Sequence, residues 1–368
     1  MSTSETTGDV NGGIADLLDG FRRQFAQPAV AAAVADASGI RASGAAGVRD
    51  LLSNHPVSAD DRFHIGSCTK AMTATAIASL VEDGTLQWAT TVADALGALA
   101  GPVHAAYRSA TLEQLLQHRA GVRPCTNRPG DDDSPVNVDA LRQSLTGTAV
   151  AQRAAFVQAI LHHPPLETPG QRTLYSNAGY TVAACMAETV TGQSWEALMR
   201  DRVFRPLAMA TAGFGWPAAA PHPDQPWGHT WDATAQRLLP HAPDDVYRLG
   251  PCLGPGGDVH CCIADLARFA REHAIGLQGR SVLLSRETFA RLHAPCGAYS
   301  MGWNITDVAP IGRLSAHAGS AGTFFAQMVV CQASGMVFAV ATNAGTGEAA
   351  VQVIPGALMK RFLPGEIR

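Results

Sequence analysis

The sequence predicts an α/β (α+β) protein in which one antiparallel sheet carries an inserted helical domain. Strand patterns lie near both ends of the 368-residue chain, and helical patterns fill the middle. Strands from both ends can pair into a single sheet, and the helices between them then pack as a separate unit. We expect a sheet domain from residues 14–84 and 240–365, a mainly helical domain from residues 85–239, and a disordered segment at residues 1–13.

The first elements are an amphipathic helix at residues 14–25 and a hairpin of strands 30–35 and 44–48, interrupted around Ser38 and Gly39. An alanine-rich helix over residues 71–81 follows, and Gly84 suits its C-cap. The later periodic segments predict helices at 111–116, 152–161 and 349–362, and strands at 299–303, 323–331 and 336–342.

Two long segments have the composition of ordered loops, namely residues 123–137 and residues 215–231. Loops of this length in a compact protein are usually functional or disordered. The second loop holds Trp216, Trp227 and Trp231, which argue against disorder. We expect it to form a wall of a binding cleft. The alternative is a loop that its aromatic side chains attach to the surface.

Charge and hydropathy exclude several classes of partner. The net charge is −4 and no basic run occurs, so we expect neither nucleic acid nor a membrane as a partner. No segment approaches 18 uninterrupted apolar residues. Residues 1–13 are polar, contain no lysine or arginine and are not followed by the apolar run of a signal peptide. This favours a cytoplasmic protein.

The cysteines and histidines do not form a metal-binding pattern. Eight cysteines are scattered without a framework spacing, and we expect free, mostly buried thiols. His260, Cys261 and Cys262 are adjacent, but neighbouring residues seldom ligate one ion and no second cluster completes the set. We expect no metal and no organic cofactor, since phosphate-binding glycine motifs are absent as well.

Nearly all positively charged residues of the chain are arginines, so the position of the few lysines is informative. Only two lysines occur, Lys70 and Lys360, and Ser67 precedes the first by three residues. Two residues three apart on a helix share a face, so the Lys70 amine can reach the Ser67 hydroxyl. A lysine, unlike arginine, can also lose its proton when it is buried. The pair therefore suits a serine nucleophile with a lysine base, although a serine at this position is often only an N-cap.

Two later segments add groups of the same chemistry. Tyr175 and Asn177 lie between a proline–glycine turn and a helix. A tyrosine near a cationic lysine loses its proton more easily, and an asparagine can hydrogen-bond an acyl carbonyl. Further along, His317 is followed by small residues on a predicted strand, where a substrate backbone can approach closely.

Ser67-Cys68-Thr69-Lys70, Tyr175-Ser176-Asn177 and His317-Ala318-Gly319 follow in this order, separated by roughly 110 and 140 residues. This arrangement resembles the serine β-lactamase and penicillin-binding-protein superfamily, above all its class C-like branch with DD-peptidases and family VIII carboxylesterases. The segment from Leu115 to Gly121 and the pair Gly256-Gly257 are similar to further motifs of that branch. The resemblance covers nearly the whole chain and implies a β-lactamase/transpeptidase-like fold.

The resemblance also implies roles for particular residues. Ser67 would be the acylated nucleophile, Lys70 or Tyr175 its base, and His317 the residue that tunes Tyr175 and the leaving group. Asn177 would orient the acyl group. The substrate-binding strand would comprise Ala318, Gly319 and Ser320, with the oxyanion hole made by the backbone N–H groups of Ser67 and Ser320.

One position departs from the pattern of enzymes that cleave β-lactams or D-alanyl peptides. Those enzymes usually have Thr or Ser where this chain has Ala318, and a hydroxyl there helps bind the substrate carboxylate. We therefore expect a serine hydrolase that acts on a small-molecule ester or amide, namely a carboxylesterase or small-amide hydrolase. The alternatives are a D-alanyl-D-alanine carboxypeptidase or β-lactamase, an acyltransferase, or a catalytically silent protein. The oligomeric state is left open.

Overall fold

The computed structural model describes residues 7–126, 136–219, 222, 224–242 and 249–363. Its centre is a six-stranded antiparallel sheet, which confirms the predicted fold class. Strands from the N-terminal part of the chain pair with strands from its C-terminal part, and Val30 lies opposite Thr342. In sheet order the strands are β2 (Gly39–Gly47), β1 (Ala29–Asp36), β11 (Val337–Thr342), β10 (Phe325–Cys331), β9 (Gly312–Ser320) and β8 (Asn304–Val308).

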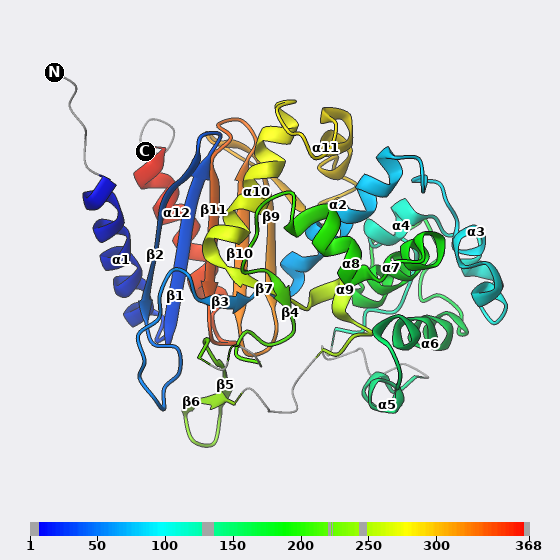
Figure 1. The fold of residues 1–368 in the computed structure, drawn as a ribbon, viewed down its shortest axis with the longest axis horizontal. Coiled ribbons are helices and arrows are strands. Elements are labelled where there is room, and N and C mark those ends of the chain that lie inside the picture. The colour runs from blue at the N-terminus through cyan, green and yellow to red at the C-terminus, as the bar shows by residue number, and fades with distance from the viewer. Residues whose placement is uncertain (1–6, 127–135, 220–221, 223, 243–248, 364–368) are drawn as a thin grey trace.

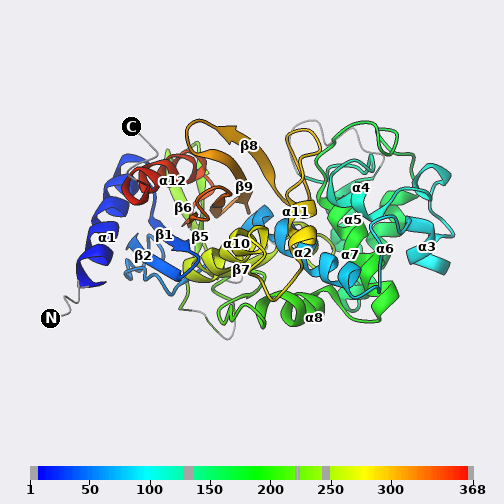
Figure 2. The ribbon, with the colours of Figure 1, turned by 90° about the horizontal axis from the view of Figure 1, so that it is seen from above.

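Helices cover both faces of this sheet, as Figures 1 and 2 show. The helices α1 (Thr7–Gln24) and α12 (Glu348–Phe362) pack on one face, and α10 (Ile263–Leu277) packs on the other. The alternation of β1 explains this arrangement. Val30, Ala32 and Val34 contact the first pair of helices, while the intervening alanines join the cluster around α10. The small side chains of β1 let both helical layers approach a strand that is buried on both faces.

The remaining helices gather beyond the sheet, away from α1 (Figure 1). Their shared core includes Leu112, Leu116, Phe156 and Tyr180. The division into two domains at residues 84 and 239 stays a prediction. The helices of this region are α2 (Thr69–Glu82), α3 (Val92–Leu96), α4 (Leu112–Leu116), α5 (Val138–Ser144), α6 (Ala149–Leu161), α7 (Asn177–Thr191) and α8 (Trp195–Met199).

Short elements connect the helical region with the sheet. A small three-stranded sheet has the order β3-β7-β4, and a two-stranded ribbon pairs β5 with β6. The elements are β3 (Arg62–His64), β4 (Gly213–Phe214), β5 (Gly228–Asp232), β6 (Arg237–His241), β7 (Val259–Cys262) and the helices α9 (Gly254–Gly257) and α11 (Arg286–Leu292).

Two predictions about local structure are wrong. Helix α1 begins at Thr7, so residues 7–13 are helical rather than disordered, and residues 1–6 lie outside the described part. The strand predicted at residues 299–303 is a tight turn, and β8 starts only at Asn304. Gly302 has a φ of +87°, and a β-carbon there would lie 2.4 Å from the Ala71 Cα. This close packing against α2 requires the turn, and local strand propensity cannot reveal it.

All eight cysteines are free, and seven of them are buried, as predicted. Burial raises the pKa of the Cys68 thiol, next to the nucleophile candidate, to about 12. Of the helices in the described residues, none is long and apolar enough to cross a membrane. A cytoplasmic location stays a prediction.

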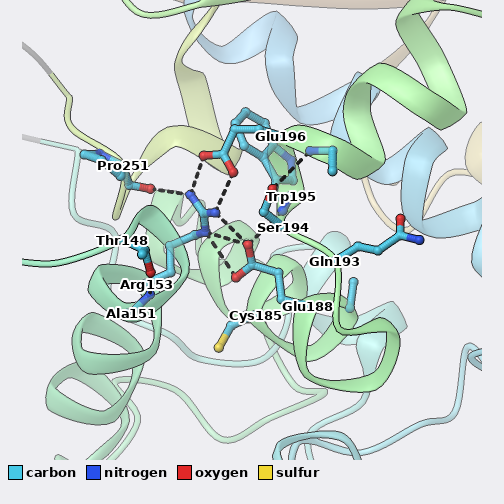
Figure 3. Close-up of polar contacts among 12 residues, drawn as sticks. Thr148, Ala151, Arg153, Cys185, Glu188, Gln193, Ser194, Trp195, Glu196 and Pro251 are labelled. Carbon is cyan, nitrogen blue, oxygen red and sulfur yellow. Dashed lines mark hydrogen bonds and ion pairs between the residues drawn. The ribbon is translucent and has the colours of Figure 1, made fainter.

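A buried ion group connects three helices of the helical region (Figure 3). Arg153 of α6 is completely buried and donates to Glu188 of α7 at 2.6 Å and to Glu196 of α8 at 2.8 Å. Its Nη1 also donates to the Pro251 carbonyl at 3.0 Å. The guanidinium therefore holds α6, α7, α8 and the segment before α9 in one arrangement.

Replacing Arg153 by methionine should lower the free energy of unfolding by about 3–5 kcal/mol, because the buried Glu188 then keeps its charge without a partner. Urea unfolding followed by circular dichroism measures the change. Arg172→Met is the matched control, since Arg172 is 76% exposed and lies 3.5 Å from Glu167; it should change stability by less than about 0.5 kcal/mol. Equal unfolding midpoints for the two variants would contradict this account.

Candidate active site

The nucleophile candidate lies in one 3₁₀ turn, Gly66–Cys68, directly before α2. Gly66 has a φ of +50°, which brings the chain sharply from β3 into the helix. Ser67 is partly exposed, whereas Lys70 on the next turn is completely buried. The Lys70 Nζ lies 3.1 Å from the Ser67 Oγ. The structure therefore brings the predicted serine and lysine into direct contact.

Two further acceptors hold the amine of Lys70. Its Nζ donates to the Asn177 Oδ1 and to the Gly256 carbonyl, both at 2.6 Å. Asn177 in turn donates from Nδ2 to the Cys125 carbonyl at 2.9 Å. These contacts show that Asn177 positions the lysine, whereas its predicted role in orienting the acyl group stays a prediction. The contact between the Lys70 amine and the Gly256 carbonyl is one that no sequence pattern indicates, although Gly256 belongs to a motif of the branch.

Tyr175 stands next to this amine. Ser176 caps α7, because its Oγ accepts the Gly179 N–H at 2.9 Å, and this fixes the residues on either side of it. The Lys70 Nζ lies 4.7 Å from the centre of the Tyr175 ring, within the range of a cation–π contact. Tyr175 is half-buried, so a substrate bound at Ser67 has access to it.

His118 contacts both Tyr175 and Ser176 and holds them in position. Its Nδ1 accepts the Ser176 N–H at 3.1 Å, and its ring lies 4.3 Å from the Tyr175 ring. Burial first, and then the charge of Lys70, holds the pKa of His118 well below its ordinary value, so the ring is neutral. The sequence analysis assigned no role to His118, although the Leu115–Gly121 motif contains it. Its function depends on a contact with a residue that lies 58 positions later.

Strand β9 closes the other side of the site. Its pairing with β8 ends at Ala316, so residues 317–320 lie beyond the last pair on that edge. A β-carbon on Gly319 would lie 2.5 Å from the Ser67 nitrogen and 2.0 Å from the Ile65 carbonyl oxygen. The backbone of β9 therefore contacts the nucleophile turn directly, and only glycine fits at this position. An oxyanion hole made by the N–H groups of Ser67 and Ser320 stays a prediction.

His317 is buried on the inner side of β9 and does not act as a cation. Its Nδ1 lies 2.7 Å from the Gly302 carbonyl, which can only accept, so Nδ1 carries the proton and Nε2 is bare. Burial, helped by the positive charge of Lys70, lowers the pKa of His317 to about 3. The positive charge near Tyr175 therefore comes from Lys70 and not from His317.

A third histidine, His64, supports the nucleophile turn, which is the 3₁₀ turn Gly66–Cys68. The Nδ1 of His64 accepts the Gly66 N–H at 3.1 Å, and its Nε2 lies 3.1 Å from Asp258 Oδ1. His64 and Asp258 also line a cavity of about 230 Å³ next to this turn. Trp216, at the start of the predicted loop, lines the same cavity, while the role of this loop as the wall of a binding cleft stays a prediction. Trp231 is half exposed instead, and residues 127–135 of the other predicted loop lie outside the described residues.

The candidate metal cluster has other contacts. His260 Nδ1 lies 2.9 Å from the Gly215 carbonyl, and burial lowers the pKa of this histidine to about 4. Within the described part of the chain, no three side chains of His, Cys, Asp or Glu form a group that could hold a metal ion.

Comparison with known proteins identifies relatives of this fold and site. Penicillin-binding protein 4 of Amycolatopsis lactamdurans is 28% identical over 329 residues, which are 82% of this chain and 77% of that protein. Unguisins hydrolase ungD of Aspergillus violaceofuscus is 32% identical over 190 residues, which are 50% of this chain and 31% of that protein. This chain thus spans less than a third of the fungal hydrolase.

Solved structures share the fold at low identity. The D-amino acid amidase of Ochrobactrum anthropi SV3 superposes with a TM-score of 0.73 at 19% identity, covering 96% of this chain and 99% of that one. EstCE1, described as a hydrolase with promiscuous acyltransferase activity, superposes with a TM-score of 0.76 at 16% identity, covering 93% and 97%. A family model described as Beta-lactamase matches residues 14–358. Because that match includes both the sheet and the serine–lysine pair, the chain belongs to the β-lactamase family of serine hydrolases.

Proposed function

We propose that this protein hydrolyses carboxylic esters or small amides through an acyl-enzyme on Ser67. The observation that carries the proposal is the 3.1 Å contact between the Ser67 Oγ and the completely buried Lys70 amine, beside the Tyr175 ring. A serine hydroxyl is a weak nucleophile at neutral pH, and an adjacent base activates it. Two groups that could serve as that base come from different segments, since the Lys70 amine contacts Ser67 and the Tyr175 ring lies beside that amine.

In the proposed reaction, the Ser67 Oγ attacks the carbonyl carbon while its proton leaves through Lys70 or Tyr175. The contacts of Lys70 fit both routes. A protonated amine can donate to all three acceptors, and a neutral amine can donate to Asn177 and Gly256 while it accepts from Ser67. The same proton then passes to the departing alcohol or amine. A water molecule releases the acid in a second, equivalent step.

The substrate class follows from the strand that lines the site. Ala318 has no hydroxyl for a substrate carboxylate, and an unpaired carboxylate binds poorly. The fold shared with an amidase and with EstCE1 supports small amides and esters. The identity with penicillin-binding protein 4 favours the alternative of a D-alanyl-D-alanine carboxypeptidase or β-lactamase. EstCE1 keeps an acyltransferase as a further alternative.

The test compares p-nitrophenyl butyrate with nitrocefin on wild type, Ser67→Ala and the control Ser38→Ala, an exposed serine in the β1–β2 turn. We expect wild type and Ser38→Ala to hydrolyse the ester and leave nitrocefin intact, with Ser67→Ala at least about 10³-fold slower in kcat/KM. Faster turnover of nitrocefin than of the ester would move the protein to the β-lactamase class. No turnover of either, with no adduct on Ser67 by intact mass, would indicate a silent protein.

A further inference from the structure

The cavity beside the nucleophile turn combines aromatic walls with acidic groups. Its volume is about 230 Å³, and its lining includes Trp195, Phe214 and Trp216 together with Asp258 and Glu196. Trp216 packs 5.9 Å from the His64 ring, which closes the cavity towards β3. Aromatic faces carry partial negative charge, so both kinds of wall attract a cation.

The acidic groups here keep net negative charge. His64 accepts the Gly66 N–H at Nδ1, so its Nε2 carries the single proton of a neutral ring and donates it to Asp258 Oδ1. In the described residues, no arginine or lysine forms an ion pair with Asp258, whose side chain is 18% exposed. Glu196 shares the one Arg153 cation with Glu188, so that group also sums to one negative charge.

The position of the cavity connects it with the reaction. His64 hydrogen-bonds Gly66, the residue before the nucleophile, and Ala321 follows the strand residue Ser320 at the other side of the site. Gly254 and Asp258 flank Gly256, whose carbonyl holds Lys70. The cavity therefore lies next to the turn that carries Ser67 and next to the segment that holds Lys70.

We propose that this cavity binds a primary ammonium group of the substrate, with Asp258 as its counter-ion and the tryptophan faces around its carbon attachment. The inference rests on the proposed function for the identity of the ligand as a substrate. Arg153 and Arg200 already lie 5.9 Å and 5.0 Å from the Trp195 and Phe214 rings, so Asp258 and Trp216 carry the preference for an ammonium group. A carboxylate in the same place would lie beside Asp258 and Glu196, and a neutral alkyl group would add no cation to pair with Asp258. The protein thus selects esters or amides of amino compounds over their neutral counterparts.

The experiment measures binding, so that it does not depend on turnover. Isothermal titration of the wild-type protein with 2-phenylethylammonium chloride and with 2-phenylethanol compares a cation with a neutral molecule of the same size. We expect the ammonium to bind at least about tenfold more tightly. Asp258→Asn, which keeps an oxygen for His64, should remove this preference. The control Asp307→Asn removes the same charge from an exposed residue of β8 and should leave the preference unchanged.

Two results would overturn the inference: equal affinity of the two probes for wild type, or an ammonium preference that survives in Asp258→Asn. Trp216→Leu provides a second variant if Asp258→Asn does not fold, and it should weaken ammonium binding more than alcohol binding. Equal weakening of both probes would mean that the wall is merely apolar. Failure of the ester assay with a normal ammonium preference would refute the proposed function alone, since the titration requires no acylation.

Discussion

Replacing Lys70 by methionine should reduce kcat/KM for p-nitrophenyl butyrate by at least about 10³-fold. Methionine has nearly the same length as lysine but neither donates a hydrogen bond nor carries charge. The variant therefore loses the contact with Ser67 Oγ and the positive charge beside Tyr175. Steady-state kinetics measures the effect, and circular dichroism verifies that the variant is folded, because Asn177 and Gly256 also lose their donor.

The chain offers a matched control for this experiment. Lys360→Met changes the only other lysine, an exposed residue near the end of α12, and should keep wild-type kinetics. Lys70→Arg should be as inactive as Lys70→Met, because arginine stays protonated and its fork does not fit a completely buried site made for an amine. A Lys70→Met variant that keeps more than about a tenth of the wild-type kcat/KM would show that Tyr175 alone activates the serine.

Acid should unfold this protein well above the pH at which ordinary carboxylates titrate. Burial is the main cause that lowers the pKa of six histidines, and for His293 and His317 it lies at about 3. The others are His118, His229, His260 and His273. Such a histidine stays neutral in the folded protein, while in the unfolded chain it takes up a proton below about pH 6.5.

The sign of the effect follows from proton counts. Below about pH 6.5 the unfolded state binds more protons than the folded state, so stability falls as the pH falls towards the folded pKa values. Each histidine that stays neutral removes about 1.4 kcal/mol per pH unit over that window. Urea unfolding at pH 7.5, 6.0, 5.0 and 4.5 should therefore give steeply decreasing midpoints. This effect exceeds that of most single substitutions.

The buried pair His273 and His293 tests whether the burial of neutral histidines causes this loss of stability in acid. His273 Nδ1 lies 2.9 Å from His293 Nε2, whose other nitrogen lies 2.7 Å from Ser315 Oγ. His273→Gln removes one titrating group, so the slope of stability against pH between 6.0 and 4.5 should fall by about 1.4 kcal/mol per pH unit. A wild-type midpoint that does not change between pH 7.5 and 4.5 would refute the account.

The sequence predicted the catalytic residues better than their supports. That the candidate residues Ser67, Lys70 and Tyr175 lie together was predictable, because the chemistry limits the residue types and their order. His118 and the Gly256 carbonyl were not assigned roles, since each acts through a contact between segments far apart in the chain. The same limit applies to His64 with Asp258, whose separate positions carry no signal. For the fold, strand patterns sufficed at β1, β10 and β11, whereas the turn at Gly302 depends on its packing against Ala71.

The pairing of Val30 with Thr342 has a consequence for synthesis on the ribosome. Strand β1 is translated before the helical segments, whereas one of its two neighbours, β11, is translated after them. Until then the nascent chain exposes one edge of an alanine- and valine-rich strand, which is a template for wrong pairing. The helical segments between can pack earlier through local contacts, because loop closure over so long a separation comes late. We expect strand β9 to meet Ser67 only in the final stage of folding, so that a translation product truncated before β11 carries no working nucleophile.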